Sequence, residues 1–277
     1  MTGKEIIENG IRKLSAAGIE SAEREAAILL SEITGCSSAG CYLLDNIDFD
    51  TKDKYIGLIK RRCAGEPLQI IIGEWEFYGR PIRLRETVFI PRPETEGLVE
   101  LVLKHIQQDA PAKGLEIGVG SGAISINLLA ERPELLMVGC DISEEALALT
   151  RENAEFLNVS ERLALIKTDV AETVEGVFDF VVSNPPYVTT EELEGLSIEV
   201  KNEPRQALDG GDDGLRIIKS IIETTTRLIK PGGFIALEIH ERLGEEVKGL
   251  MEERSLSTET YKDLSGKNRY ALAFKEV

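Results

Sequence analysis

The sequence predicts an α/β fold preceded by a small helical domain, and three observations indicate this. From residue 113 onwards, short apolar segments alternate with segments of helical spacing, which is typical of a parallel sheet covered by helices on both faces. A glycine-rich turn joins the first of these strands to its helix. Residues 1–65, in contrast, show helical spacing only. The chain of 277 residues is long enough to form two domains.

Composition excludes several classes of protein. The chain is 42% hydrophobic and 29% charged, as in ordinary soluble proteins. Its net charge of −17 argues against sequence-independent binding to the phosphates of DNA or RNA. No apolar run approaches the roughly 18 residues of a membrane span, and the N-terminus lacks the apolar core of a signal peptide. We therefore expect a cytoplasmic protein without membrane association. Because the two histidines and four cysteines show no metal-ligand spacing, no metal site is expected.

Three regions follow from the patterning. Residues 1–65 form a helical domain, with one helix ending near Gly18, a second beginning after Ser21 and a third at about 51–63. Residues 66–86 are expected to form a linking β-hairpin with strands at 68–72 and 75–78. Residues 87–277 form the α/β domain, which begins with a helix at 98–106. Its expected strands are 114–117, 136–140, 164–167, 178–182, 233–239, 257–261 and 269–275.

The turn after the first strand of this domain is rich in glycine. Its sequence at 116–122 is Glu-Ile-Gly-Val-Gly-Ser-Gly, and glycines there let backbone N–H groups approach a ligand closely. The G-x-G-x-G spacing differs from the G-x-G-x-x-G dinucleotide fingerprint. On this turn alone, a ligand-binding loop and a purely structural turn both remain open.

The next two strands each end in a carboxylate. Asp141 follows the second strand, where a carboxylate can accept hydrogen bonds from both hydroxyls of a ribose. Asp169 follows the third strand and is suited to accept from an adenine amino group, with Val170 beside the ring. Each aspartate taken alone could equally be a helix N-cap. Ligand-facing residues at successive strand ends predict a binding crevice at the carboxyl edge of the sheet.

The fourth strand leads directly into Asn-Pro-Pro-Tyr at 184–187. Two prolines make this loop stiff and extended, because each fixes its own φ and restricts the residue before it. The oxygen of Asn184 and a neighbouring carbonyl can accept both hydrogens of one planar NH₂ group, and Tyr187 offers a flat face to it. The tetrapeptide therefore indicates chemistry on an amide or exocyclic amino nitrogen, the alternative being a turn that merely ends the strand.

With these motifs in place, the chain resembles the HemK/PrmC family of protein-(glutamine-N5) methyltransferases. The tetrapeptide is shared with enzymes that methylate adenine or cytosine amino groups. Pro-Arg-Pro-Glu-Thr-Glu at 91–96, Glu-Pro-Arg-Gln-Ala-Leu at 203–208 and Gly-Gly-Asp-Asp-Gly-Leu at 210–215 are more specific. The matching stretches are 65–69, 73–79, 90–96, 116–124, 182–187, 203–208, 210–215 and 263–269.

The resemblance implies a class I S-adenosylmethionine-dependent methyltransferase fold, Rossmann-like, with a seven-stranded, mostly parallel sheet. It also implies an N-terminal domain that recognises the substrate, S-adenosylmethionine as methyl donor, and no direct binding of nucleic acid. The substrate would be a class I peptide-chain release factor, methylated on the amide nitrogen (N5) of the glutamine in its Gly-Gly-Gln motif.

Site residues carried over from the family fall into two groups. Those expected to bind the methyl donor are Glu116, Gly118, Val119, Gly120, Ser121, Gly122, Asp141, Asp169, Val170 and Asn184. Asn184, Pro185, Pro186 and Tyr187 would receive the glutamine, with Phe89 closing the pocket and with Asn184, Pro185 and Tyr187 as the catalytic residues.

Three other functions compete with this interpretation. A DNA or RNA amino-methyltransferase would use the same tetrapeptide on a flipped base, but the acidic charge argues against it. A nicotinamide oxidoreductase lacks its glycine fingerprint here. A non-catalytic acidic binding module would not need the glycine loop, Asp141 and Asn184. For His240, near the expected crevice edge, we favour no functional role.

Overall fold

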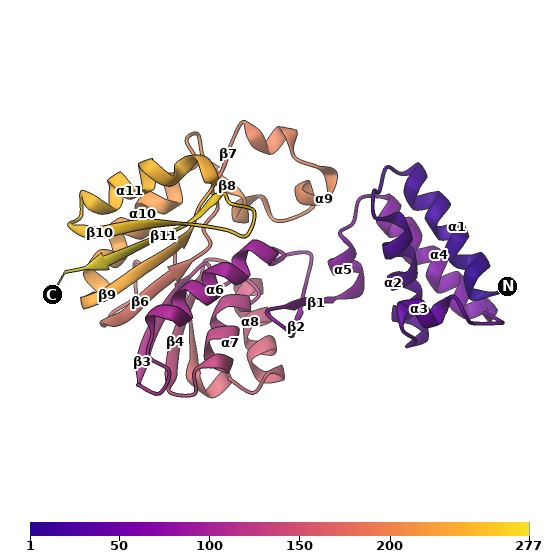
Figure 1. Ribbon diagram of the computed structural model, residues 1–277, viewed down its shortest axis with the longest axis horizontal. Helices are drawn as coiled ribbons and strands as arrows, with labels where there is room; N and C mark the ends of the chain where they lie inside the picture. Colours follow the sequence, from indigo (N-terminus) through magenta and orange to yellow (C-terminus); the bar gives the residue numbers. More distant parts are fainter. Residues whose placement is uncertain (277) are drawn as a thin grey trace. The chain divides into compact units, whose positions relative to one another are not determined.

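The computed structural model describes residues 1–276, which fold as two units (Figure 1). The first unit comprises residues 1–75 together with 197–202, and the second comprises 76–196 and 203–277. The segment 197–202 carries the short helix α9 (Ile198–Lys201), so a piece of the chain from the middle of the second unit's sequence completes the first unit. The domain boundaries expected from sequence did not include this excursion.

The first unit is helical. The three predicted helices form, and polar residues cap the first and the last of them: Thr2 makes a capping box with Glu5, and Asp48 accepts from Thr51 N at 2.8 Å. The short helix at Ser38–Cys41 was not predicted. Tyr55 is buried in the shared core and donates its hydroxyl to the Ala26 carbonyl at 3.2 Å. The helices are α1 (Gly3–Ala16), α2 (Ala22–Thr34), α3 (Ser38–Cys41), α4 (Phe49–Cys63) and α5 (Leu68–Ile72).

The prediction of a strand at 68–72 is wrong, because this segment forms helix α5. Pro67 precedes its first turn, Gly73 ends it with φ at +88°, and Leu68 and Ile71 face the core of the first unit at helical spacing. A short apolar run does not distinguish strand from helix. The hairpin is shorter than expected, with β1 (Glu74–Phe77) and β2 (Arg80–Arg83) joined at a Tyr-Gly turn.

A buried ion pair stabilises the first unit. Arg62 of α4 is almost fully buried and donates to both carboxylate oxygens of Glu25 on α2, at 2.5 and 3.2 Å, while also donating to Glu199 of α9 at 2.7 Å. Charged groups removed from water must be paired, and deleting one partner leaves the other uncompensated. The pair therefore joins α2, α4 and α9 within this unit.

Arg62→Ala is expected to lower the free energy of unfolding of the first unit by about 3–5 kcal/mol, because Glu25 would remain buried without its partner. Trp75, the single tryptophan, packs against the core of this unit, so its fluorescence in a urea titration reports on this unit. Lys54→Ala, which breaks the exposed Lys54–Asp50 pair, is the control and should leave the transition unchanged. Equal curves for the two variants would contradict the prediction.

The second unit contains a seven-stranded sheet in the order β10-β11-β9-β6-β3-β4-β5. The pairs β9–β6, β6–β3, β3–β4 and β4–β5 are parallel, and β11 is antiparallel to β9 and β10. This confirms the predicted seven-stranded, mostly parallel sheet. The strands are β3 (Ala112–Ile117), β4 (Leu135–Asp141), β5 (Leu163–Lys167), β6 (Phe178–Ser183), β9 (Ile229–Glu238), β10 (Leu256–Lys262) and β11 (Asn268–Lys275).

Helices cover both faces of this sheet (Figure 1). Along β3, Leu115 and Ile117 join the core formed with α10 (Arg216–Thr225) and α11 (Gly244–Glu252), whereas Glu116 points to the opposite face, against α7 (Ala123–Glu131). Helices α6 (Pro93–His105) and α8 (Glu144–Phe156) pack with α7 on that second face. In the described residues, no helix is long and apolar enough to cross a membrane.

A small parallel pair lies beyond the sheet. Strands β7 (Val188–Thr189) and β8 (Asp209–Gly211) form it directly after the Asn-Pro-Pro-Tyr loop. A Cβ on Gly210 would lie 2.8 Å from Tyr187 Cα, and one on Gly214 would lie 2.6 Å from the Tyr187 carbonyl oxygen. Gly210 and Gly214 are therefore required for close packing against the backbone of Tyr187.

Candidate active site

The candidate site is a cavity of about 610 Å³ at the carboxyl ends of β3, β4 and β6. It lies where the strand order reverses, because β4 and β6 occupy opposite sides of β3, and this is where parallel α/β sheets bind ligands. Predicted residues that line the cavity are Phe89, Glu116, Gly118, Val119, Gly120, Ser121, Asp141, Asp169, Val170, Asn184 and Pro186. Three predicted residues, Gly122, Pro185 and Tyr187, are not part of its lining.

The glycine loop at 118–122 is shaped by its backbone. Gly118, Gly120 and Gly122 all have φ between +57° and +84°, in the left-handed region. This conformation directs the N–H groups of Gly118 and Val119 to the Cys140 carbonyl, at 2.8 and 2.9 Å. A Cβ on Gly122 would come within 2.7 Å of Ile126 and 2.9 Å of Thr150, so this last glycine allows α7 and α8 to pack.

Glu116 is a buried acid on the wall of the cavity. Its carboxylate accepts from the backbone N–H of Ser125 at 2.9 Å and from the Ser125 hydroxyl. Burial raises the pKa of Glu116 to about 8, the Ser125 hydrogen bonds oppose that rise, and the charge of Asp141 adds to it. A cationic group of a ligand placed beside Glu116 would lower this pKa and favour the ionised form.

Asp141 closes the loop from the end of β4. Its carboxylate accepts from Gly120 N at 3.0 Å and from Ser143 N at 2.9 Å, and burial raises its pKa. Each carboxylate oxygen has a second lone pair, so a ligand diol can still donate to it. The backbone contacts of Asp141 keep the glycine loop and the start of α8 in register around the cavity.

The third strand end carries a strained residue. Val170 has φ at +48°, a left-handed conformation that a β-branched side chain rarely adopts. Such strain costs on the order of 1–3 kcal/mol and persists where the surroundings determine the backbone. Asp169 and Val170 both line the cavity, so the strained turn places an acid and an apolar side chain next to each other in the site.

Asn184 lines the cavity, and a chain of hydrogen bonds holds its side chain there. Its Nδ2 donates to Thr95 Oγ1 at 3.0 Å, and Thr95 Oγ1 donates to Glu238 Oε2 at 2.7 Å. Because the single hydroxyl hydrogen of Thr95 goes to the carboxylate, Thr95 can only accept from Asn184. The amide oxygen of Asn184 is therefore left as an acceptor on the cavity wall.

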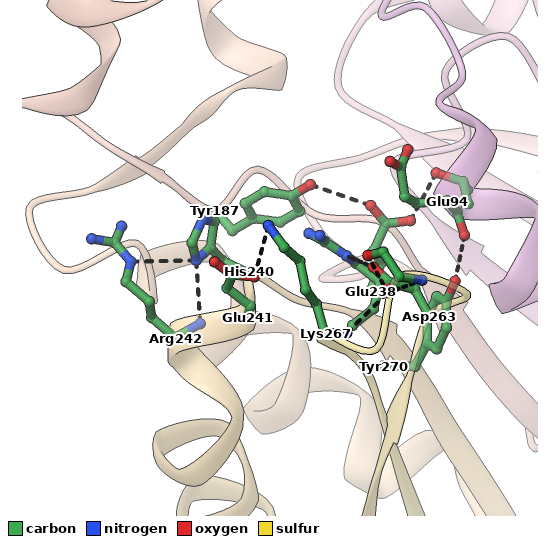
Figure 2. A network of polar contacts seen from close by, with 12 residues as sticks. Glu94, Tyr187, Glu238, His240, Glu241, Arg242, Asp263, Lys267 and Tyr270 are labelled. Carbon is green, nitrogen blue, oxygen red and sulfur yellow. Dashed lines mark hydrogen bonds and ion pairs between the residues drawn. The ribbon is translucent and has the colours of Figure 1, made fainter.

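Tyr187 is connected to the same acid. Its hydroxyl donates to Glu238 Oε1 at 3.2 Å, and its ring packs edge-on against His240 with 6.0 Å between centroids (Figure 2). The sequence predicted Tyr187 beside the planar NH₂ group. In the structure the hydroxyl of Tyr187 is bound to Glu238, and Tyr187 does not line the cavity.

Several residues that shape the site were missed. Glu203 accepts from Ile90 N at 3.0 Å and from Arg92, and the Arg92 guanidinium stacks on the ring of Phe89 at 4.8 Å. Glu203 and Arg92 lie inside the stretches 203–208 and 90–96, so the signal for them was present in the sequence. Residues that line the cavity itself were also missed, among them Thr87, Pro91, Thr95, Pro204, Arg205, Gln206, Asp209 and Arg216.

Comparison with known proteins identifies the family. The PrmC N-terminal domain family matches residues 5–73, and the methyltransferase small domain family matches residues 95–208. A release factor glutamine methyltransferase of Aquifex aeolicus is 40% identical over 90% of this chain and 90% of its own. The chain belongs to the release factor glutamine methyltransferases. A second member, from Moorella thermoacetica, is 34% identical over 99% of both chains.

A solved structure agrees with this fold. A 16S rRNA N2 methyltransferase of T. thermophilus, in complex with AdoMet and guanosine, matches with a TM-score of 0.53 at 18% identity. The match covers 73% of this chain and 50% of that one. At this identity the likeness concerns the fold alone.

Proposed function

We propose that this protein transfers a methyl group from S-adenosylmethionine to the side-chain amide nitrogen (N5) of a glutamine, namely that of the Gly-Gly-Gln motif in class I peptide-chain release factors. Family membership over 90% of the chain supports the substrate. The observation that carries the chemistry is the orientation of Asn184, whose amide oxygen is available as an acceptor in the cavity. A release factor as substrate also supports a cytoplasmic location.

The cavity has features that fit the methyl donor. S-adenosylmethionine has a cationic amino-acid end, a ribose diol and a planar base, and its sulfonium supplies an electrophilic methyl group. Glu116 would hold the ammonium, the glycine loop the carboxylate, and Asp141 the diol. Asp169 would accept from the adenine amino group, and Val170 would lie against the ring. A buried acid, a half-buried acid and a left-handed glycine loop at successive strand ends are the observation that supports this fit.

The glutamine amide would be activated by its hydrogen-bond partners. An amide nitrogen is a poor nucleophile because its lone pair is delocalised into the carbonyl. Asn184 Oδ1 and the Pro185 carbonyl would accept its two N–H groups, and their dipoles would stabilise the positive charge that develops on nitrogen. Holding both reactants in place contributes further. No strong base is required, because a methylated, cationic nitrogen loses its proton readily.

The remaining predicted residues would shape the acceptor side. Phe89, held by the stacked Arg92, would cover the glutamine side chain, and Pro186 would line the wall beside it. The helical unit, built around residues 1–65, remains the predicted recognition domain for the release factor.

The test offers several acceptors at once. The protein is incubated with S-adenosylmethionine labelled in its methyl group and with a release factor, DNA, RNA or ribosomal proteins in separate reactions. We expect label on the release factor alone, and its loss when the glutamine of Gly-Gly-Gln is changed. Label on DNA or RNA would instead support the base-methylating alternative, and label on none of the acceptors would contradict the proposal.

A further inference from the structure

One buried carboxylate holds both ends of the Asn-Pro-Pro-Tyr loop. Figure 2 shows its contact with Tyr187, the last residue of the loop. Glu238, at the end of β9, is 1% exposed. Its Oε2 accepts from Thr95, which in turn accepts from Asn184, and its Oε1 accepts from Tyr187. The three contacts join α6, β9 and the loop after β6, so the first and last residues of the tetrapeptide are tied to the same acid.

The direction of these hydrogen bonds depends on Glu238. An ionised carboxylate only accepts, so Thr95 must donate to it and must accept from the Nδ2 of Asn184. If Glu238 were protonated, its own hydrogen could go to Thr95 Oγ1. The Thr95 hydroxyl would then be free to donate, and Asn184 could turn its amide over and present Nδ2 to the acceptor. A donor at that place would repel the N–H groups of a glutamine amide.

We propose that Glu238 is a positioning residue of methyl transfer, whose carboxylate acts through Thr95 to fix the amide oxygen of Asn184 towards the acceptor and, through Tyr187, holds the far end of the same loop. This inference rests on the proposed function. It assigns to Glu238 and Thr95 no contact with the reacting atoms.

The surroundings of Glu238 indicate that its charge state is finely balanced. Burial raises the pKa of Glu238 to about 7, the hydrogen bonds from Thr95 and Tyr187 and the charge of Arg269 lower it, and Glu94 raises it. Glu94 lies on α6, where its carbonyl accepts from Tyr270 of β11 at 2.5 Å (Figure 2). Arg269 donates to Asp263 at 3.1 Å. The imidazole of His240 contacts the ring of Tyr187, whose hydroxyl binds Glu238.

The sign of the pH effect follows from this balance. Because the ionised form of Glu238 is the orienting one, the turnover number should fall as the pH is lowered through about 7. Stability should change in the opposite direction. The pKa of Glu238 is raised in the folded state, so the folded protein binds the proton more tightly and loses stability between the unfolded pKa and about 7 as the pH rises.

The test is the pH profile of methyl transfer to a release factor by the full chain. Glu238→Gln should lower kcat by roughly tenfold to a hundredfold at pH 8, which corresponds to a lost charged hydrogen bond. It should also remove the acid limb of the profile and leave the affinity for S-adenosylhomocysteine unchanged in calorimetry. The melting temperature of Glu238→Gln should exceed that of the unmodified protein by the largest margin at high pH, where Glu238 is charged.

Two matched variants of Thr95 and one of His240 separate this role from a merely structural one. Thr95→Val should lower kcat like Glu238→Gln, and Thr95→Ser, which keeps the hydroxyl, should restore it. His240→Gln should keep the acid limb, which excludes the imidazole as its source. The Thr95 pair also tests the proposal should Glu238→Gln fail to fold.

The outcomes distinguish the two proposals. Unaltered kcat and pH profile in Glu238→Gln, in a protein that labels the release factor, would overturn the positioning role and leave the function intact. Equal activity of Thr95→Val and Thr95→Ser would do the same. Absence of label with the unmodified protein would overturn the proposed function, and the positioning role with it.

Discussion

Asn184→Ala is expected to slow methyl transfer to the release factor by at least about 100-fold, the effect of removing one hydrogen-bond partner of developing charge. Asn184 supplies the acceptor oxygen on the cavity wall, and no neighbouring side chain of the tetrapeptide can replace it. Single-turnover rates at saturating S-adenosylmethionine measure the effect, and calorimetry with S-adenosylhomocysteine measures cofactor affinity, which should change little.

Asn184→Asp is the matched control for this prediction. It keeps the shape of the side chain, but an ionised carboxylate cannot donate to Thr95 and the hydrogen-bond chain to Glu238 is broken. The rate should therefore fall although an acceptor oxygen is still present. An equal loss of cofactor affinity in both variants would mean that Asn184 binds the methyl donor first and the glutamine second.

Asp141→Ala should have its main effect on the methyl donor. Removing this carboxylate deletes the acceptor for the N–H groups of Gly120 and Ser143 as well as the proposed acceptor for the ribose, so the dissociation constant for S-adenosylmethionine is expected to rise roughly tenfold to a hundredfold. Calorimetry gives this constant directly. At saturating donor, the rate of transfer should recover to within a few-fold.

Asp141→Asn should be milder, because its amide oxygen can still accept from Gly120 N at one position. A pronounced loss of rate that saturating donor does not restore would contradict the assignment of Asp141 to the cofactor. It would place this acid in the transfer step.

Local patterns predicted most of the second unit. The strands at 178–182 and 136–140 are short apolar runs bounded by turn residues, and the structure has strands at both places. The segment 68–72 is also a short apolar run, yet it is helical, because Leu68 and Ile71 pack on the helices of the first unit. Which face such a run buries is decided by tertiary packing, and the sequence does not contain that information locally.

Part of the candidate site could likewise be predicted from sequence, and part could not. The glycine loop, Asp141 and Asn184 lie at strand ends, so their convergence follows from the alternation of strands and helices. The roles of Thr95 and Glu238 could not be predicted in this way, because the bonds Asn184–Thr95 and Thr95–Glu238 join residues 89 and 143 positions apart. Nothing in the local sequence at 238 distinguishes an orienting acid from an ordinary strand end.

The excursion of α9 into the first unit is another long-range feature. Asn202 donates to the Gly65 carbonyl at 2.9 Å, and Arg62 binds Glu199. These contacts connect residues 137 positions apart, so no window of sequence reveals them.

The most direct test of the account is to locate the transferred methyl group. After reaction with unlabelled S-adenosylmethionine, the release factor is digested and the peptide containing Gly-Gly-Gln is fragmented in a mass spectrometer. We predict the mass of one methyl group on the glutamine side chain, present with the unmodified protein and absent with Asn184→Ala. A methyl group on another residue would contradict the central claim. So would a peptide that is still unmodified after prolonged incubation with the unmodified protein.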